Sequence, residues 1–131
     1  MKKTGLLNQP ISSVIAGLGH TDTLVIADAG LPVPATTERI DLAVSAGVPS
    51  FLDVLGAVLG EMQVESAVIA EEMAERSPDM HRAVLELLAG IPIESVSHEE
   101  FKARTAFSRA VVRTGEFTPF ANVNLSAGVV F

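Results

Sequence analysis

Apolar residues recur along this chain with two alternating spacings, one typical of helices and the other typical of buried strands. The first helical segment is predicted to begin at Pro10 and to end at Gly19, because the apolar residues between them lie three or four positions apart. The run Thr23–Ala27 is continuously apolar instead, which predicts a short buried strand. Helix and strand therefore already alternate within the first 27 residues.

The same alternation continues to the end of the chain. Three further helices are predicted, one after a capping Ser50, one between Pro78 and Gly90, and one after Ser97, which forms a capping box with Glu100. Further strands are predicted over Arg39–Val44, Ser66–Ala70, Ile91–Val96, Ala110–Gly115 and Asn122–Phe131. Continuous apolar strands separated by helices favour an α/β fold with a mostly parallel sheet covered on both faces. The length of 131 residues fits one domain, 1–131.

Charge and composition exclude several classes of partner. The net charge is −7 and no cluster of Lys or Arg interrupts it, so we expect no binding to nucleic acid. The longest uncharged stretch, Thr4–Thr21, is broken by polar residues, which argues against a membrane span or a signal peptide. There is no cysteine and no glycine-rich nucleotide motif, so we expect a cytoplasmic protein without cofactor or metal.

Charged residues make up 19% of the chain, below the average of about 25% for soluble domains. The last fifteen residues, Phe117–Phe131, carry no charge at all. A shortage of charge predicts that some surface is buried between subunits. An apolar core strand would explain the uncharged tail equally well.

Polar residues that a core does not require follow several predicted strands. Asp28 follows the first predicted strand, Thr23–Ala27, and His98 follows the fourth, Ile91–Val96. His20 lies in the loop before the first strand. In open α/β sheets ligands bind beyond the carboxyl ends of strands, so an acid and imidazoles there suggest acid–base chemistry. If His20 lies beside Asp28, it suits the role of general acid. Each residue also has a structural explanation: His20 as a helix cap, Asp28 as a turn residue, His98 as an exposed helix start.

The segment Arg113–Asn122 combines charged and polar side chains with Gly, Pro and two Phe residues. Polar groups beside an aromatic wall suit a sugar, whose hydroxyls form hydrogen bonds while its C–H face packs on a ring. A tight turn between two buried strands is the structural alternative.

The motifs "GLGHTD", "VIADAGLPVP", "SHEEFK" and "VVRTGEFTPFAN" resemble, in this order, those of the D-ribose pyranase family, which is related to the fucose mutarotases. The resemblance extends over nearly the whole chain. It implies a three-layer α/β/α subunit in a decamer of two pentameric rings, with sites at subunit contacts. It also implies cofactor-independent interconversion of the pyranose and furanose forms of D-ribose.

The resemblance assigns roles to individual residues. His20 matches the family's proton donor, and the positions that match its sugar-binding residues are Asp28, His98, Phe120, Ala121 and Asn122. The family usually has "TPYAN" where this chain has "TPFAN", so Phe120 keeps the ring and lacks the hydroxyl. This departure leaves two alternatives open: a mutarotase acting on anomers of fucose or another monosaccharide, and a non-catalytic sugar-binding subunit.

Overall fold

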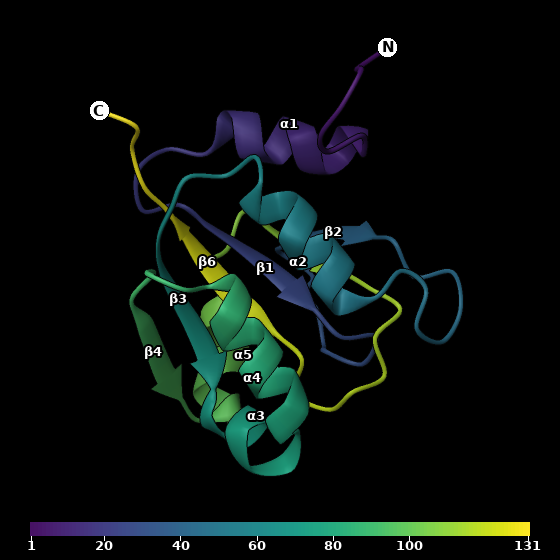
Figure 1. Ribbon diagram of the computed structural model, residues 1–131, viewed down its shortest axis with the longest axis vertical. Coiled ribbons are helices and arrows are strands. Elements are labelled where there is room, and N and C mark those ends of the chain that lie inside the picture. Colours follow the sequence, from purple (N-terminus) through teal and green to yellow (C-terminus); the bar gives the residue numbers. More distant parts are fainter.

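The computed structural model describes all residues from 1 to 131. The helices are α1 (Gln9–Gly17), α2 (Phe51–Leu59), α3 (Glu71–Arg76), α4 (Pro78–Leu87) and α5 (His98–Thr105). The strands are β1 (Thr23–Ala27), β2 (Glu38–Asp41), β3 (Val64–Ala70), β4 (Ile93–Val96), β5 (Ala110–Arg113) and β6 (Val123–Ala127). They form one domain (Figure 1).

The six strands make a single sheet in the order β2-β5-β1-β6-β3-β4. β6 runs antiparallel to both of its neighbours, β1 and β3, and all other pairs are parallel. The prediction of a mostly parallel sheet is therefore confirmed. The carboxyl ends of the five parallel strands consequently share one edge of the sheet, where Ala27 is aligned with Arg113 and Ala70 with Val96.

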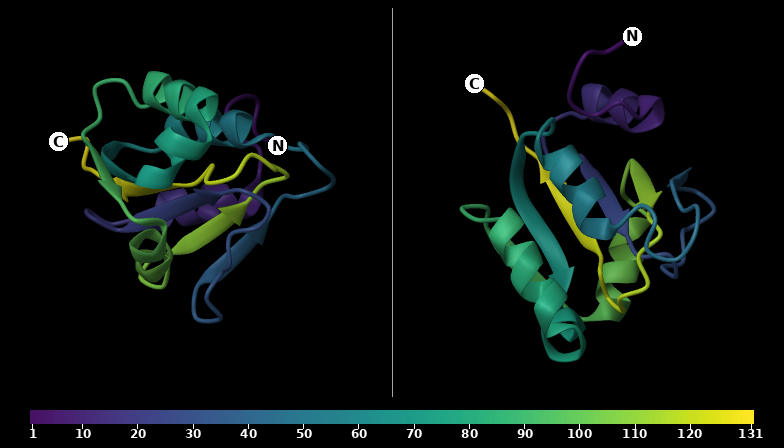
Figure 2. Two further views of the ribbon diagram at one scale, coloured as in Figure 1. Left: turned by 90° about the horizontal axis from the view of Figure 1, so that it is seen from below. Right: turned by 45° about the vertical axis from the view of Figure 1, so that its right-hand side comes forward.

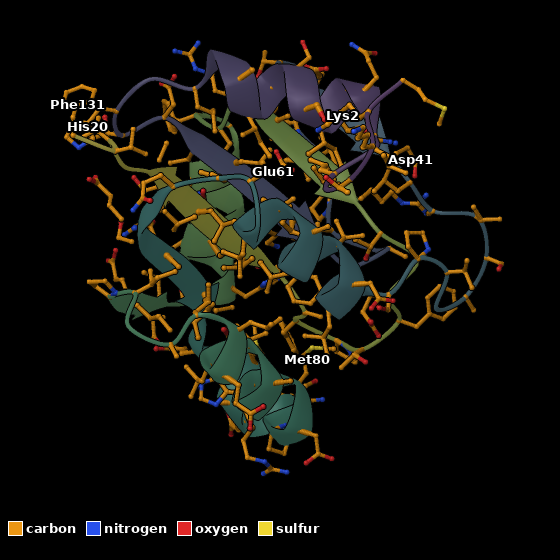
Figure 3. All side chains as sticks on the ribbon, turned by 45° about the horizontal axis from the view of Figure 1, so that its top comes forward. Lys2, His20, Asp41, Glu61, Met80 and Phe131 are labelled. Carbon is orange, nitrogen blue, oxygen red and sulfur yellow. The ribbon has the colours of Figure 1, made fainter.

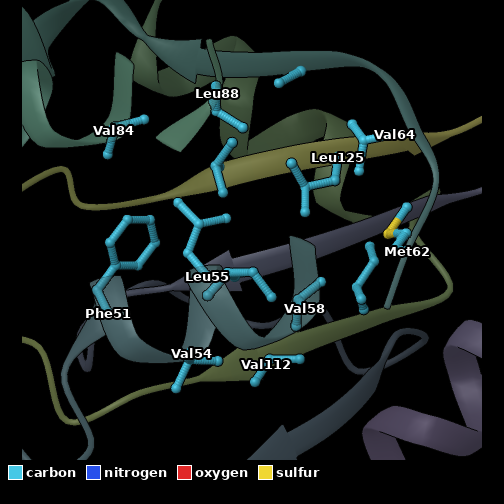
Figure 4. Close-up of a cluster of buried hydrophobic side chains, with 14 of the residues drawn as sticks. Phe51, Val54, Leu55, Val58, Met62, Val64, Val84, Leu88, Val112 and Leu125 are labelled. Carbon is cyan, nitrogen blue, oxygen red and sulfur yellow. The ribbon is translucent and has the colours of Figure 1, made fainter. Parts of the chain in front are cut away.

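Helices cover both faces of the sheet and give the three-layer arrangement (Figure 2). On one face the main core joins α2 and α4 to β1, β3, β5 and β6 (Figure 4). Phe51 and Leu55 of α2 and Leu88 after α4 are fully buried there. On the other face α5 inserts Phe101 against Val25 and Val111. The two clusters bury alternate residues of β1, as expected for a strand covered on both sides.

Short-range signals account for most helix starts. The side chains of Asn8, Ser50 and Ser97 cap α1, α2 and α5 by accepting a backbone N–H from the first turn. The capping box is only half formed, because the carboxylate of Glu100 binds Arg104. None of the helices is long and apolar enough to cross a membrane.

The structure corrects several predicted elements. The strands predicted over Ile91–Val96, Ala110–Gly115 and Asn122–Phe131 are each shorter, as β4, β5 and β6. The strand predicted over Arg39–Val44 ends at Asp41, whose carboxylate accepts the N–H of Ala43 and turns the chain. The helix predicted to end at Gly19 stops two residues earlier. Helix α3 was not predicted, because Met73 is its only buried residue and leaves no apolar periodicity.

The uncharged tail has two parts with different surroundings. β6 is an interior strand of the sheet and is mostly buried, so the apolar-strand explanation holds for Val123–Ala127. The last residues do not share this burial, since Val130 and Phe131 are 84% and 101% exposed.

Candidate functional site

Asp28 and Asn122 form a two-way hydrogen-bonded pair at the carboxyl edge of the sheet. Asp28 follows β1, and Asn122 precedes β6, which enters the sheet at that edge. The Asn122 amide donates to the Asp28 carboxylate at 2.9 Å, and its oxygen accepts the Asp28 N–H at 2.9 Å. Asn122 is fully buried, whereas Asp28 is only half-buried. The pair therefore fixes a carboxylate that solvent and ligands can reach.

Asp28 also forms the turn that its sequence context predicts. Its second carboxylate oxygen accepts the N–H of Gly30 at 2.9 Å. The structural explanation of this residue is thus correct, and it is compatible with a role in binding because the carboxylate remains partly accessible.

His98 and Phe120 form the aromatic part of the same edge. Their rings meet edge to face, with centroids 5.0 Å apart and planes at 87°. The His98 ring also lies parallel to that of Phe101 at 6.4 Å. The Nδ1 atom of His98 is buried and has no hydrogen-bond partner. The structural alternative for His98, an exposed helix start, is therefore wrong in part: the residue does begin α5, but its imidazole is half-buried among aromatic rings.

The backbone between Phe120 and Asn122 is tightly turned. Phe120 has a φ of 64°, in the left-handed region that non-glycine residues rarely occupy. The Asn122 N–H donates to the Phe120 carbonyl at 2.8 Å across Ala121, which is fully buried. This turn carries the ring toward His98 and the amide toward Asp28, so one segment connects both halves of the edge.

Glu72 belongs to this edge and was not predicted. Both of its carboxylate oxygens accept the backbone N–H of His98, at 2.9 and 3.1 Å. This hydrogen bond holds the pKa of the Glu72 carboxyl below its ordinary value, although desolvation acts in the opposite direction. A carboxylate from α3 therefore caps α5 at the residue that carries the imidazole. The two residues are 26 positions apart, so no local pattern in the sequence indicates the contact.

The charged residues of the Arg113–Asn122 segment form hydrogen bonds with other residues of the same chain. Arg113 donates to the Ala29 carbonyl and binds Asp41. Glu116 accepts from Thr118 and from the N–H of Phe51. Burial raises the pKa of Glu116, but these hydrogen bonds outweigh it and hold the pKa below its ordinary value.

Gly115 of this segment lies against another loop, where a Cβ atom would come within 2.4 Å of the Val48 carbonyl oxygen. The tight-turn explanation therefore holds for the first half of the segment. Beside it a cavity of about 420 Å³ reaches Asp28, with Gly30, Arg113 and Thr118 in its wall.

His20 lies at the opposite end of the sheet, and the predicted proximity of His20 to Asp28 within one chain is wrong. The loop with His20 precedes β1, whereas Asp28 follows it. Figure 3 accordingly shows His20 on the other side of the molecule from Asp41, which ends β2 at the carboxyl edge. The His20 ring does not cap α1 either: its Nε2 atom lies 2.8 Å from the Glu65 carboxylate.

The structure thus brings together Asp28, His98, Phe120, Ala121 and Asn122 and leaves His20 apart. No three His, Asp or Glu side chains lie close enough together to hold a metal ion. The chemistry available at the carboxyl edge is that of a carboxylate and an imidazole beside an aromatic ring.

Comparison with known proteins identifies relatives over the whole chain. Residues 1–130 match the model of the RbsD / FucU transport protein family. D-ribose pyranases of Pectobacterium atrosepticum and Symbiobacterium thermophilum are each 56% identical to this chain, with both chains fully covered.

Solved structures agree in fold. That of Bacillus subtilis RbsD complexed with D-ribose matches with a TM-score of 0.97 at 46% identity over both whole chains. The fucose mutarotase of Streptococcus pneumoniae in complex with L-fucose has the same fold, with a TM-score of 0.82 at 23% identity and 95% coverage of each chain. The resemblance in the sequence motifs is confirmed, and this chain belongs to the RbsD/FucU family.

Proposed function

We propose that this protein is a cofactor-independent isomerase that interconverts the pyranose and furanose forms of D-ribose. The observation that carries the proposal is its 56% identity, over the full length, to proteins named D-ribose pyranase. The relative whose structure contains D-ribose shares 46% of its residues and has nearly the same fold.

The carboxyl edge is the proposed sugar-binding half of the site, with Asp28, His98, Phe120, Ala121 and Asn122 as its residues. The Asp28 carboxylate would accept hydrogen bonds from sugar hydroxyls, and the Phe120 ring would pack on the apolar C–H face. The buried Nδ1 of His98 has no hydrogen-bond partner in this chain. A sugar hydroxyl would supply one, and the new hydrogen bond would favour sugar binding.

His20 is the proposed proton donor and would reach the sugar from a neighbouring copy of the chain. Its position beyond the other end of β1 supports this proposal, because the same chain cannot present both halves to one sugar. We propose a decamer of two pentameric rings, in which the His20 loop of one subunit meets the carboxyl edge of the next. The exposed Val130 and Phe131 would be covered in such an assembly.

The proposed reaction needs only proton transfer. His20 donates a proton to the ring oxygen while the anomeric hydroxyl loses one, which breaks the bond between the ring oxygen and C1 and yields the open aldehyde. Rotation presents a different hydroxyl, whose oxygen attacks C1 as its own proton is removed and the aldehyde oxygen takes up a proton, so the cycle consumes no net proton. General acid–base catalysis of roughly 10²–10⁴-fold accounts for such a step. A cytoplasmic location, after sugar uptake, is part of this proposal.

Phe120 favours one alternative, a mutarotase acting on anomers of another monosaccharide, because it lacks the hydroxyl that the family usually has there. Saturation-transfer NMR on D-ribose and L-fucose separates the two activities, since ring-size exchange and anomer exchange connect different peaks. Enhanced pyranose–furanose exchange of D-ribose is the expected result. Sugar binding with unchanged exchange rates would instead indicate a non-catalytic subunit.

Mixing two inactive variants tests the shared site. His20→Ala and His98→Ala damage opposite halves, so co-assembled subunits should regain activity in about a quarter of their sites, those that combine both intact halves at random. No recovery in verified mixed oligomers would contradict a site shared between subunits.

A further inference from the structure

Glu65 is the one side chain that the structure pairs with His20. Its carboxylate lies 2.8 Å from the Nε2 atom of the imidazole, and the two side chains are 39% and 54% exposed. Nothing in the sequence motifs points to Glu65, which is 45 positions away on β3.

An irregularity in β3 aims Glu65 at this partner. Val64 is aligned with Ala127 of β6, but Ser66 is aligned with Ser126, so Glu65 is the extra residue of a β-bulge. Bulges change the direction of a side chain and are frequent beside active sites. Gly128 provides the necessary space, because a Cβ atom there would lie 3.1 Å from the Cβ of Glu65.

Two hydrogen bonds hold the loop that carries His20 in place. The Asp22 carboxylate accepts the Gly19 N–H at 2.9 Å, and the Thr21 N–H donates to the Ala127 carbonyl at 2.9 Å. Thr21 has a φ of 69°, which is strained for a β-branched residue. Strained backbone of this kind persists where surrounding contacts enforce it, as often happens at functional sites. The same residue of β6, Ala127, thus anchors the His20 loop and borders the bulge of Glu65.

We propose that Glu65 is a positioning residue for His20: it accepts the Nε2–H and leaves Nδ1 as the nitrogen that gives the proton to the sugar. The inference rests on the proposed function. A histidine has two ring nitrogens, and the partner of one fixes the ring orientation and the role of the other. Glu65 itself would not touch the sugar, because its carboxylate lies on the Nε2 side of the ring.

Glu65→Gln tests this role, since it keeps the shape of the side chain and removes the carboxylate. We expect kcat for ribose exchange to fall by about 10–100-fold, the range found when the partner that orients a metal-ligating histidine is removed. KM should change less than about twofold, because sugar binding belongs to the other half-site. Glu75→Gln, an exposed acid of α3 without a hydrogen-bonded partner, is the matched control and should retain wild-type kcat.

A stability measurement and one further variant separate positioning from a general loss of structure. Urea unfolding of Glu65→Gln should give nearly the stability of the wild type, because the pair with His20 is exposed and contributes little to it. Gly128→Ala should lower kcat while removing no functional group, since the new Cβ displaces Glu65. Wild-type kcat in Glu65→Gln, with His20→Ala inactive, would overturn this inference and leave the proposed function intact. Absence of catalysed ribose exchange in the wild-type protein would contradict the proposed function itself, whereas wild-type exchange by His20→Ala would contradict only the role of His20.

Discussion

His20 and Asp28 flank the same strand, one before β1 and the other directly after it. Five extended residues between them span roughly 17 Å. A proton donor acts only within about 3 Å of the atom that receives the proton, or through one water molecule. The two residues can therefore serve one sugar only if they come from different copies of the chain.

His20→Ala should abolish catalysed ribose exchange and leave the fold intact. The imidazole is more than half exposed, and its contact with Glu65 is an exposed pair worth no more than about 1 kcal/mol. Saturation-transfer NMR gives the exchange rate, and urea unfolding gives the stability. A variant that retains wild-type exchange would show that His20 has no part in the chemistry.

Asn122→Ala should destabilise the protein by about 1–3 kcal/mol, because it empties a fully buried position and leaves the part-buried Asp28 N–H and one carboxylate oxygen without their partners. Asp28→Asn should cost less stability, because its one side-chain oxygen can still accept a hydrogen bond from the Gly30 N–H or from the Asn122 amide. It should nevertheless weaken sugar binding. Unfolding at equal protein concentrations compares the variants, because assembly makes stability concentration-dependent. Equal stability of Asn122→Ala and wild type would contradict the buried pair.

Glu72→Gln should change how stability depends on pH. The folded state lowers the pKa of Glu72, chiefly through the hydrogen bond from the His98 N–H, so the stabilisation is complete above the ordinary pKa of a glutamate and is lost as the pH falls through the folded value. Wild type should therefore exceed Glu72→Gln in stability near pH 7, and the difference should shrink below about pH 4.

Unfolding measured from pH 7 to pH 3 checks this expectation. Glu71→Gln is the control, because it removes a charge from an exposed neighbour that forms no side-chain hydrogen bond. A difference between wild type and Glu72→Gln that stays constant with pH would refute the linkage.

Local signals in the sequence were sufficient for much of this fold. The strand Thr23–Ala27 and the caps Ser50 and Ser97 were predicted correctly, because each depends on residues within a few positions. The grouping of Asp28 and His98 at one edge followed from the rule that parallel strands end together.

Contacts between distant segments could not be predicted in the same way. Glu65 reaches His20 only because of a β-bulge opposite Ala127, and Glu72 caps α5 from a short helix without apolar periodicity. The separation of His20 from Asp28 could have been predicted. His20 precedes the strand β1 and Asp28 follows it, so the two residues lie at opposite ends of that strand.

The protein should form an oligomer much larger than a dimer. Its low charge content is explained only in part by the buried strand β6, and Val130 and Phe131 remain exposed in the single chain. Light scattering at micromolar concentration measures the mass. A monomer mass would contradict both the buried-surface interpretation and the shared site.

Phe120→Tyr should increase turnover of D-ribose. The Phe120 ring already meets His98 edge to face, and the substitution only adds a hydroxyl at the far end of the ring, so the ring should keep its place. A neutral hydrogen bond contributes roughly 0.5–1.5 kcal/mol, which corresponds to about tenfold in rate at the upper end. The gain should appear in kcat more than in affinity if the hydroxyl forms its bond mainly in the transition state.

Exchange rates of both proteins on D-ribose and L-fucose provide the measurement. Lower activity of Phe120→Tyr on ribose would mean that the site buries the new hydroxyl without a partner, at a cost of about 1–3 kcal/mol. That result would count against a ribose pyranase, because a site that evolved for ribose with a tyrosine at this position should accept the hydroxyl again. Faster exchange of L-fucose anomers by the wild type than by Phe120→Tyr would then identify the phenylalanine as a change in sugar preference.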